Sequence, residues 1–477
     1  MSGPAAAAPA TSNVRAVVGL LVAFELVSGF LQGSAVPLIP EIQDRFGVGT
    51  GQAQWFTTVQ YLAAAIGVPA FGRLGDLYGH RRMLRVALGC VALGTVLVAC
   101  APDLAVLLLG RALMGPLAAL LPLEIGLVRD RLTVAEGRRA VGLLVGSLVL
   151  GTVLGTGLIG PLLPLLGGLG GTLTALAVLA TGCVVVSYTA IPESRTRAGG
   201  RMDWRGAILL ALTLVLLLGT LSKGAHWGWL SPATLGGLAL SAALLYGWVR
   251  LQLAAPHALV DVRAMARRQN APAYASGFVL GAVMMAGQSV VVSYLAASPA
   301  DEGYGFALAT WQISVWGVVP HLMAFIASTL CATLAARTGY HRLLLLAFAL
   351  LTAGYLGLIA GHDGLAPFVT ANALVGLGCG LALGGLPTVI VENSTGDRTA
   401  SATAVYNNLK TLGGSVGGAV FSVVLGALGT GTSGTPTLRA YVTIWSIGAL
   451  AGALAVGAQL LGRRRTPSPR PAVSARV

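Results

Sequence analysis

Charged residues are scarce in this sequence. They make up 10% of its 477 residues, whereas hydrophobic residues make up 55% and mean hydropathy is +0.81. Soluble domains carry roughly 25% charged residues, so this composition argues against a soluble protein. The apolar runs are continuous and close to the ~20 residues with which a helix crosses a bilayer, and they lack the alternation of barrel strands. The sequence therefore predicts an all-α polytopic membrane protein.

Several chemical signatures are also missing. No G-x-x-x-x-G-K-[ST] phosphate-binding loop occurs, which argues against an ATP-driven pump. The five cysteines lie inside apolar runs without metal-ligand spacing, and no Ser/His/Asp constellation appears. We therefore expect no enzymatic activity, no metal and no bound cofactor. The net charge of +14 comes from arginines in short loops between apolar runs, so the expected partner is a lipid bilayer and not a nucleic acid.

The apolar runs predict fourteen transmembrane helices. They cover residues 16–39, 53–72, 83–101, 104–127, 140–165, 170–191, 206–222, 232–252, 271–296, 313–335, 343–361, 365–390, 404–427 and 440–462. Arginines gather in the loops on one side, as at Arg81 and Arg138, while the opposite loops are acidic or nearly neutral, as at Glu41 and Asp301. The positive-inside rule then places both termini in the cytoplasm. The abundance of Ala, Gly, Leu and Arg suggests a bacterial genome, and hence the bacterial inner membrane.

An internal repeat organises these helices. The stretch GRLGDLYGHRRML, residues 72–84, is echoed by LCATLAARTGYHRLLLL, residues 330–346, with Gly339 in place of Gly79 and Ala336 in place of Asp76. Both fall between the second and third helix of a six-helix set if two helices are inserted between the sets. The predicted order is a disordered tail (1–14), a six-helix bundle (15–192), a linker with two extra helices (193–270), a second six-helix bundle (271–462) and a basic tail (463–477).

The first of these stretches carries a family resemblance. It is similar to the signature loop of the major facilitator superfamily, G-x-L-a-D-r-x-G-r-k-x-x-l, and the whole chain resembles the fourteen-helix drug:proton antiporter branch. The matching positions are Gly72, Leu74, Asp76, Gly79, Arg81 and Leu84, whereas Leu77 and His80 depart from basic positions. The resemblance implies a cytoplasmic gating loop that uses Gly72, Asp76, Gly79, Arg81 and Arg82, with Gly79 in a tight turn. The other reading is a loop whose arginines only set topology.

Three ionisable residues fall inside the predicted helices of the first bundle. Glu25 and Arg111 are near mid-depth, where a charge is costly and usually has a partner. Arg111 and Gly115 match the R-x-x-x-G pattern of helix 4, and the resemblance implies a proton-coupling role in which an acid of helix 1, here Glu25, pairs with Arg111. A purely structural ion pair is the alternative. Glu124 lies near one end of helix 4 and is either a second protonatable group or a side chain that snorkels to the interface.

Helix 5 is rich in glycine. Its residues Gly151, Gly155 and Gly160, followed by Pro161, permit close helix packing. By resemblance they form the antiporter signature of this branch, which ends G-P-x-x-G-G, although this chain reads GPLLPLLGG. Plain helix packing is the alternative reading.

Four polar residues are candidates for a substrate cavity in the second bundle: Gln288, Tyr294, Asn407 and Asn408. Ordinary packing is the alternative for each. Taken together, the sequence and the resemblance predict a monomeric secondary transporter that exports lipophilic, drug- or antibiotic-like molecules in exchange for protons by alternating access. Other functions on this scaffold are proton-coupled import, export of a lipid or siderophore, and a non-transporting membrane sensor.

Overall fold

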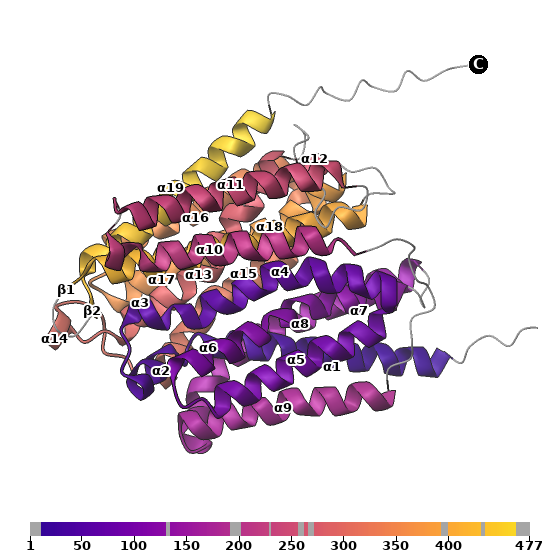
Figure 1. Cartoon of the computed structure of the whole chain (residues 1–477), viewed down its shortest axis with the longest axis horizontal. Coiled ribbons are helices and arrows are strands. Elements are labelled where there is room, and N and C mark those ends of the chain that lie inside the picture. The colour runs from indigo at the N-terminus through magenta and orange to yellow at the C-terminus, as the bar shows by residue number, and fades with distance from the viewer. Residues whose placement is uncertain are drawn as a thin grey trace, which may run out of the picture.

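The computed structural model is almost entirely helical. It describes residues 11–129, 134–190, 202–228, 230–255, 262–265, 271–392, 399–430 and 435–463, so most of the two predicted tails lies outside the described residues. Figure 1 shows long helices side by side, with the N-terminal helices in one half of the molecule and the C-terminal helices in the other. The predicted all-α class is confirmed.

The first bundle contains α1 (Thr11–Ala35), α4 (Trp55–Tyr78), α5 (His80–Ala99), α6 (Leu104–Leu113), the 3₁₀ segment η1 (Gly115–Ala119), α7 (Leu120–Arg129), α8 (Val134–Leu165) and α9 (Leu169–Ala190). Two short helices, α2 (Ile39–Phe46) and α3 (Thr50–Ala53), join α1 to α4. A hairpin follows, made of α10 (Trp204–Trp227) and α11 (Pro232–Ala254), and then the short α12 (Val262–Met265).

The second bundle contains α13 (Ala271–Ala296), α15 (Thr310–Thr338), α16 (Tyr340–Ala360), α17 (Leu365–Glu392), α18 (Thr399–Ala427) and α19 (Leu438–Arg463). The short α14 (Pro299–Glu302) precedes α15, and two-residue strands β1 (Gly429–Thr430) and β2 (Thr435–Pro436) pair between α18 and α19.

Twelve helical segments within the described ranges are long and apolar enough to cross a membrane. The expected spans 53–72 and 206–222 fall on α4 and α10, which are not among the twelve; of α10, the apolar part is Trp204–Leu217. The total of fourteen membrane helices therefore stays a prediction. Helix 4 also differs from the expected continuous helix, because η1 interrupts it at Gly115–Ala119, where Pro116 cannot donate a backbone hydrogen bond.

Glycines pack the two bundles in the same way. A Cβ on Gly151 or Gly155 of α8 would lie 2.1 or 2.3 Å from the carbonyl oxygens of Leu26 or Phe30 on α1. In the second bundle, a Cβ on Gly413 or Gly417 of α18 would lie 2.0 or 2.7 Å from the carbonyl oxygens of Phe278 or Ala282 on α13. The pair α1 and α8 therefore corresponds in its close packing to the pair α13 and α18.

The repeated stretches form two matching one-residue turns. Gly79 (φ +103) joins α4 to α5, and Gly339 (φ +81) joins α15 to α16. Each glycine N–H bonds a carbonyl four residues back, Gly75 in one case and Ala335 in the other. These left-handed backbone positions favour glycine. The expected loop at 72–84 is much shorter than predicted, because Gly72 and Asp76 belong to α4 and Arg81 and Arg82 belong to α5.

The bundles meet along two seams, defined here as the α8·α15 seam and the α4·α18 seam. Across the first, the Gly160 N–H bonds the Ser314 hydroxyl at 3.1 Å. At the end of the second, the Ser422 hydroxyl donates to the carbonyl of Gly51 in α3, the short helix that precedes α4, at 2.5 Å. Both contacts lie at the end of the molecule that holds α2, called here the Glu41 end; the opposite end, with the turns at Gly79 and Gly339, is called the Gly79 end. The bundles are thus joined at the Glu41 end.

Candidate functional site

Two acidic side chains meet inside the first bundle. Glu25 of α1 and Glu124 of α7 are each 0% exposed, and their carboxyl groups contact each other. Among the described residues, none of these four oxygens has a hydrogen-bond partner and no salt bridge reaches them. The burial of Glu124 excludes the alternative in which this side chain snorkels to the interface. The two carboxyls form an isolated acidic pair.

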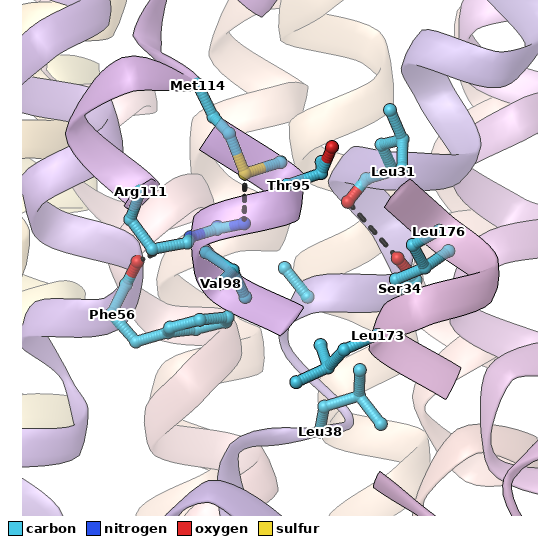
Figure 2. Close-up of a pocket in the computed structure, with 11 residues that line it drawn as sticks. Leu31, Ser34, Leu38, Phe56, Thr95, Val98, Arg111, Met114, Leu173 and Leu176 are labelled. Carbon is cyan, nitrogen blue, oxygen red and sulfur yellow. Dashed lines mark hydrogen bonds between the residues drawn. The ribbon is translucent and has the colours of Figure 1, made fainter. Parts of the chain in front are cut away.

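Arg111 lies elsewhere in the same bundle, near the end of α6. Its residue is 4% exposed, its Nε donates to the Phe56 carbonyl at 2.9 Å, and its guanidinium stands 4.1 Å from the centre of the Phe56 ring. A terminal nitrogen approaches the Met114 sulfur at 3.6 Å. Figure 2 shows the guanidinium between the Phe56 ring and the Met114 sulfur, at the edge of a pocket. The charge is therefore held by a carbonyl and an aromatic face.

The expected pairing of Glu25 with Arg111 is wrong for this structure. No salt bridge joins them, although both residues are described. The two side chains have different partners: Glu25 contacts Glu124, and Arg111 contacts Phe56. The segment η1 lies between Arg111 and Glu124 along the chain. The sequence predicted that Glu25 pairs with Arg111 and treated Glu124 separately, whereas the structure places Glu25 beside Glu124.

Two small cavities follow one face of α1 through this bundle. The first, of about 20 Å³, is lined by Arg111, Leu31 and Ser34 among others. The second, of about 10 Å³, is lined by Ser28 and Leu31 of α1 and by Cys183 of α9. Leu31 borders both cavities. Each has room for about one water molecule at most, so the interior of the bundle is tightly packed in this conformation.

The residues expected to gate the cytoplasmic face surround the Gly79 turn. The Asp76 carboxylate lies 3.3 Å from His80 Nε2, one helical turn away across Gly79. The His80 ring also packs against Gly126 of α7, where a Cβ would come within 2.1 Å of it. A histidine occupies one of the positions that are basic in the resembled pattern, and it ties the turn to α4 and α7. Arg82 is exposed in the first turn of α5.

The glycines expected in helix 5 have two different neighbours. Gly151 and Gly155 face α1 within their own bundle. Gly160 faces the first turn of α15 across the seam, where a Cβ would lie 2.5 Å from the Thr310 carbonyl oxygen. Pro161 follows Gly160 within α8 and is exposed. The glycine pattern therefore serves packing both within a bundle and between the bundles.

The four candidates for a substrate cavity are separated in space. Tyr294 is 1% exposed and is the centre of a cluster of aromatic rings at the Glu41 end. Its ring lies 5.1 Å from those of Phe368, Tyr441 and Trp445. It is a packed residue, as the alternative reading held. Gln288 is half-buried on α13, and Asn407 and Asn408 are half-buried on α18, with the Asn408 Oδ1 atom buried without a hydrogen-bond partner.

The Major Facilitator Superfamily model matches residues 21–418. The chain belongs to this superfamily. Within it, the chain is 28% identical over 465 residues to the "Probable actinorhodin transporter" of Streptomyces coelicolor, covering 94% of this chain and 79% of that protein. It is 25% identical over 410 residues to the "Tetracenomycin C resistance and export protein" of Streptomyces glaucescens, covering 81% and 71%. An uncharacterized transporter of Mycobacterium tuberculosis is 26% identical over 453 residues, and the match covers 89% of this chain and 63% of that longer protein.

Solved structures support the superfamily fold. An autoinhibited POT-family peptide transporter superposes with a TM-score of 0.67 at 16% identity, covering 97% of this chain and 99% of that one. The xylose transporter XylE from E. coli, in a partially occluded inward-open conformation, superposes with a TM-score of 0.63 at 11% identity, covering 96% and 98%. These likenesses concern the fold. The protein is thus a superfamily membrane transporter with relatives in drug and antibiotic export, as the sequence predicted.

Two features of this superfamily member were not found from the sequence. The Thr310 hydroxyl donates a 2.6 Å hydrogen bond to Glu41 Oε1 across the seam. The aromatic cluster gathers Tyr294, Tyr304 and Phe306 with residues of α17 and α19. Both join residues far apart in the chain, so no local pattern indicated them. The only signal was the concentration of aromatic residues near helix ends at one side of the second bundle.

Proposed function

We propose that this protein exports lipophilic, drug- or antibiotic-like small molecules in exchange for protons, and that the pair Glu25 and Glu124 carries the exchanged proton. The single observation on which the proton site rests is the contact between two buried carboxyl groups without a basic partner. Two carboxylates in contact inside a low-dielectric core repel each other strongly. A proton bound to one of them removes this repulsion and so stabilises the contact between Glu25 and Glu124. Loss of that proton drives the two side chains apart.

A movement of this kind has a suitable element in helix 4. A short 3₁₀ stretch within a longer helix often marks a hinge, and η1 lies between Arg111 and Glu124. Arg111 is anchored to α4 through Phe56, so a change at η1 would displace Glu124 from Glu25 while Arg111 keeps its place. In this proposal Arg111 positions helix 4, and its fixed positive charge opposes proton leakage along α1.

The cargo class is supported by the names of similar proteins, one of which is a resistance and export protein, and by the high hydrophobic content of the chain. The relatives carry the terms actinorhodin, tetracenomycin and multidrug resistance. We place the protein in the bacterial inner membrane with both termini in the cytoplasm, so that the Gly79 end faces the cytoplasm. Export then starts from the conformation described above, which is joined at the outer, Glu41 end.

The test uses inverted membrane vesicles with an imposed proton gradient and a panel of lipophilic cations and antibiotics. The wild type is compared with Glu25→Gln and Glu124→Gln, and with Asp301→Asn as a matched control, because Asp301 is an exposed acid in α14. We expect at least one compound to dissipate the gradient with wild type and Asp301→Asn, and neither glutamine variant to respond although both insert at normal levels. A wild-type response from both glutamine variants would overturn the proton site. A panel without any wild-type response would overturn drug export itself.

A further inference from the structure

The two seams between the bundles are equivalent by the internal repeat. On the α8·α15 seam, Gly160 meets Ser314 and Thr156 meets Gly317. On the α4·α18 seam, the corresponding contacts are Ser422 with Gly51 and Gly418 with Thr58. A symmetric transporter would present the same two lateral faces to the bilayer. The hairpin α10–α11 has no counterpart in the repeat and breaks this symmetry.

The hairpin covers one seam. Helix α10 packs against both α18 and α4, and so bridges the α4·α18 seam (Figure 1). Its residues Leu210 and Leu214 are buried. Two hydrogen bonds join α11 to the beginning of α10: Trp248 Nε1 donates to the Gly206 carbonyl at 3.0 Å, and Gln252 Nε2 donates to Asp203 Oδ2 at 2.8 Å. One lateral face between the bundles is thus closed by an inserted element.

The other seam lacks such a cover. The main packing neighbours of α8 and α15 among the described elements are each other and helices of their own bundles. Along the seam, Trp311 and Val315 of α15 and Leu158 of α8 are exposed, at 53%, 45% and 46%. Large apolar side chains in these positions face lipid in a membrane transporter.

The α8 face of the uncovered seam is also less tightly packed toward the Gly79 end. A Cβ on Gly157 would lie 3.2 Å from the Val318 side chain, and a Cβ on Gly160 would lie 2.5 Å from the Thr310 carbonyl oxygen. Gly146 and Gly142 lie on the same face of α8, because 3.6 residues make one turn, yet a Cβ on either would meet nothing within 4 Å. Helices α8 and α15 therefore pack tightly at the Glu41 end, whereas open space lies beside Gly142 and Gly146 toward the Gly79 end.

The equivalent position on the covered seam is different. The repeat that matches Gly151 with Gly413 and Gly155 with Gly417 matches Gly146 with Asn408. The Oδ1 atom of Asn408 is buried, whereas Gly146 borders open space. The same place in the two bundles therefore holds an asparagine with a buried side-chain oxygen on one seam and a glycine beside open space on the other.

We propose that α10–α11 seals the α4·α18 seam, and that membrane-dissolved lipophilic cargo enters the transport pathway from the bilayer through the α8·α15 seam, beside Gly142 and Gly146. This inference rests on the proposed export of lipophilic molecules and names the route that they take. Because Gly142 and Gly146 have no side chains, the passage is widest toward the Gly79 end, which is the cytoplasmic side from which the cargo is exported.

The first test blocks the passage. Gly146→Trp fills the opening, and Gly182→Trp is the matched control, since Gly182 is an exposed glycine of α9, away from both seams, with nothing within 4 Å of its Cβ position. The probe is a bisbenzimide dye that fluoresces only in the bilayer, pumped by inverted vesicles under a proton gradient. We expect Gly146→Trp to slow dye removal several-fold at normal membrane levels, and Gly182→Trp to match the wild type. Removal at the wild-type rate by Gly146→Trp would overturn the route.

The second test does not depend on transport. Spin labels are attached to Gly146→Cys and Asn408→Cys in a chain whose five native cysteines are replaced by alanine. We expect the label at 146 to be relaxed strongly by lipid-soluble oxygen, and the label at 408 to be shielded from it. Equal accessibility of the two labels would overturn the seal. If the wild type pumps no dye, drug export fails as a function, while the labels still decide which seam is open.

Discussion

Thr310 donates a 2.6 Å hydrogen bond from its hydroxyl to Glu41 Oε1, and so links the first turn of α15 to α2 of the other bundle. The carboxylate lies at a helix N-terminus, where free backbone N–H groups favour negative charge. Three other hydrogen bonds between the bundles involve neutral groups: those of Ser314 and Ser422, and a bond of 3.3 Å from Gln54 Nε2 to the Ala286 carbonyl. Among these four contacts, only the one at Glu41 has an ionisable partner.

We expect Glu41→Gln to weaken this closure. Glutamine can still accept the Thr310 hydrogen, but a hydrogen bond to a neutral group contributes about 1 kcal/mol less than one to a charged group. The equilibrium should therefore shift toward opening at the Glu41 end by about fivefold. The measurement is the distribution of spin-label distances between α2 and α15. Asp44→Asn is the control, because Asp44 is an exposed acid on the same short helix. Unchanged distances in Glu41→Gln would show that the charge of Glu41 does not help to hold the bundles together.

Gly155→Ala should destabilise the first bundle. Its new Cβ would lie 2.3 Å from the Phe30 carbonyl oxygen, and backbone cannot yield as a flexible side chain can. Overpacking of this kind costs about 1–3 kcal/mol. Thermal unfolding in detergent measures the effect. The control is Gly146→Ala on the same helix, which meets nothing within 4 Å and should be neutral or stabilising by up to about 1 kcal/mol through helix propensity. Equal unfolding temperatures for both variants would contradict the close packing of α1 and α8.

Arg111→Lys should separate charge from geometry. Lysine keeps the positive charge but lacks the planar group that stacks on Phe56 while bonding its carbonyl. If Arg111 positions helix 4, the lysine variant should transport more slowly at saturating cargo with little change in apparent affinity, and Arg111→Gln should be slower and leak protons. Flux and passive proton leak in the same vesicles provide both readouts. A lysine variant indistinguishable from the wild type would leave only the charge as important.

Tyr294 provides a test of packing against cargo recognition. Tyr294→Phe retains the ring and loses the hydrogen bond to the His362 carbonyl, which should cost about 1 kcal/mol. Tyr294→Ala leaves a hole among several rings and should cost about 3–5 kcal/mol. Because the side chain is buried in the aromatic cluster, the phenylalanine variant should keep the wild-type order of cargo preference. An altered order of cargo preference with unchanged stability would instead indicate that Tyr294 lines the substrate cavity.

Much of the fold followed from local pattern. The apolar runs predicted the helices, and the glycine of each repeated stretch predicted the turns at Gly79 and Gly339. The helix edges at these turns were misjudged, since charged residues from Asp76 to Arg82 resemble a loop in hydropathy although their backbone is helical on both sides of Gly79. The break at η1 was missed for the opposite reason, because its residues are as apolar as their neighbours.

The sequence by itself determined the membrane class, the family and the chemical inventory of buried charge, because composition, helix length and short motifs are properties of contiguous residues. Only the tertiary structure decided how that inventory is used. Glu25 and Glu124 are far apart in the chain, and their contact depends on how α1 and α7 pack. Which seam is covered likewise depends on where α10 packs. Side chains distant in sequence become neighbours only through the packing of whole helices.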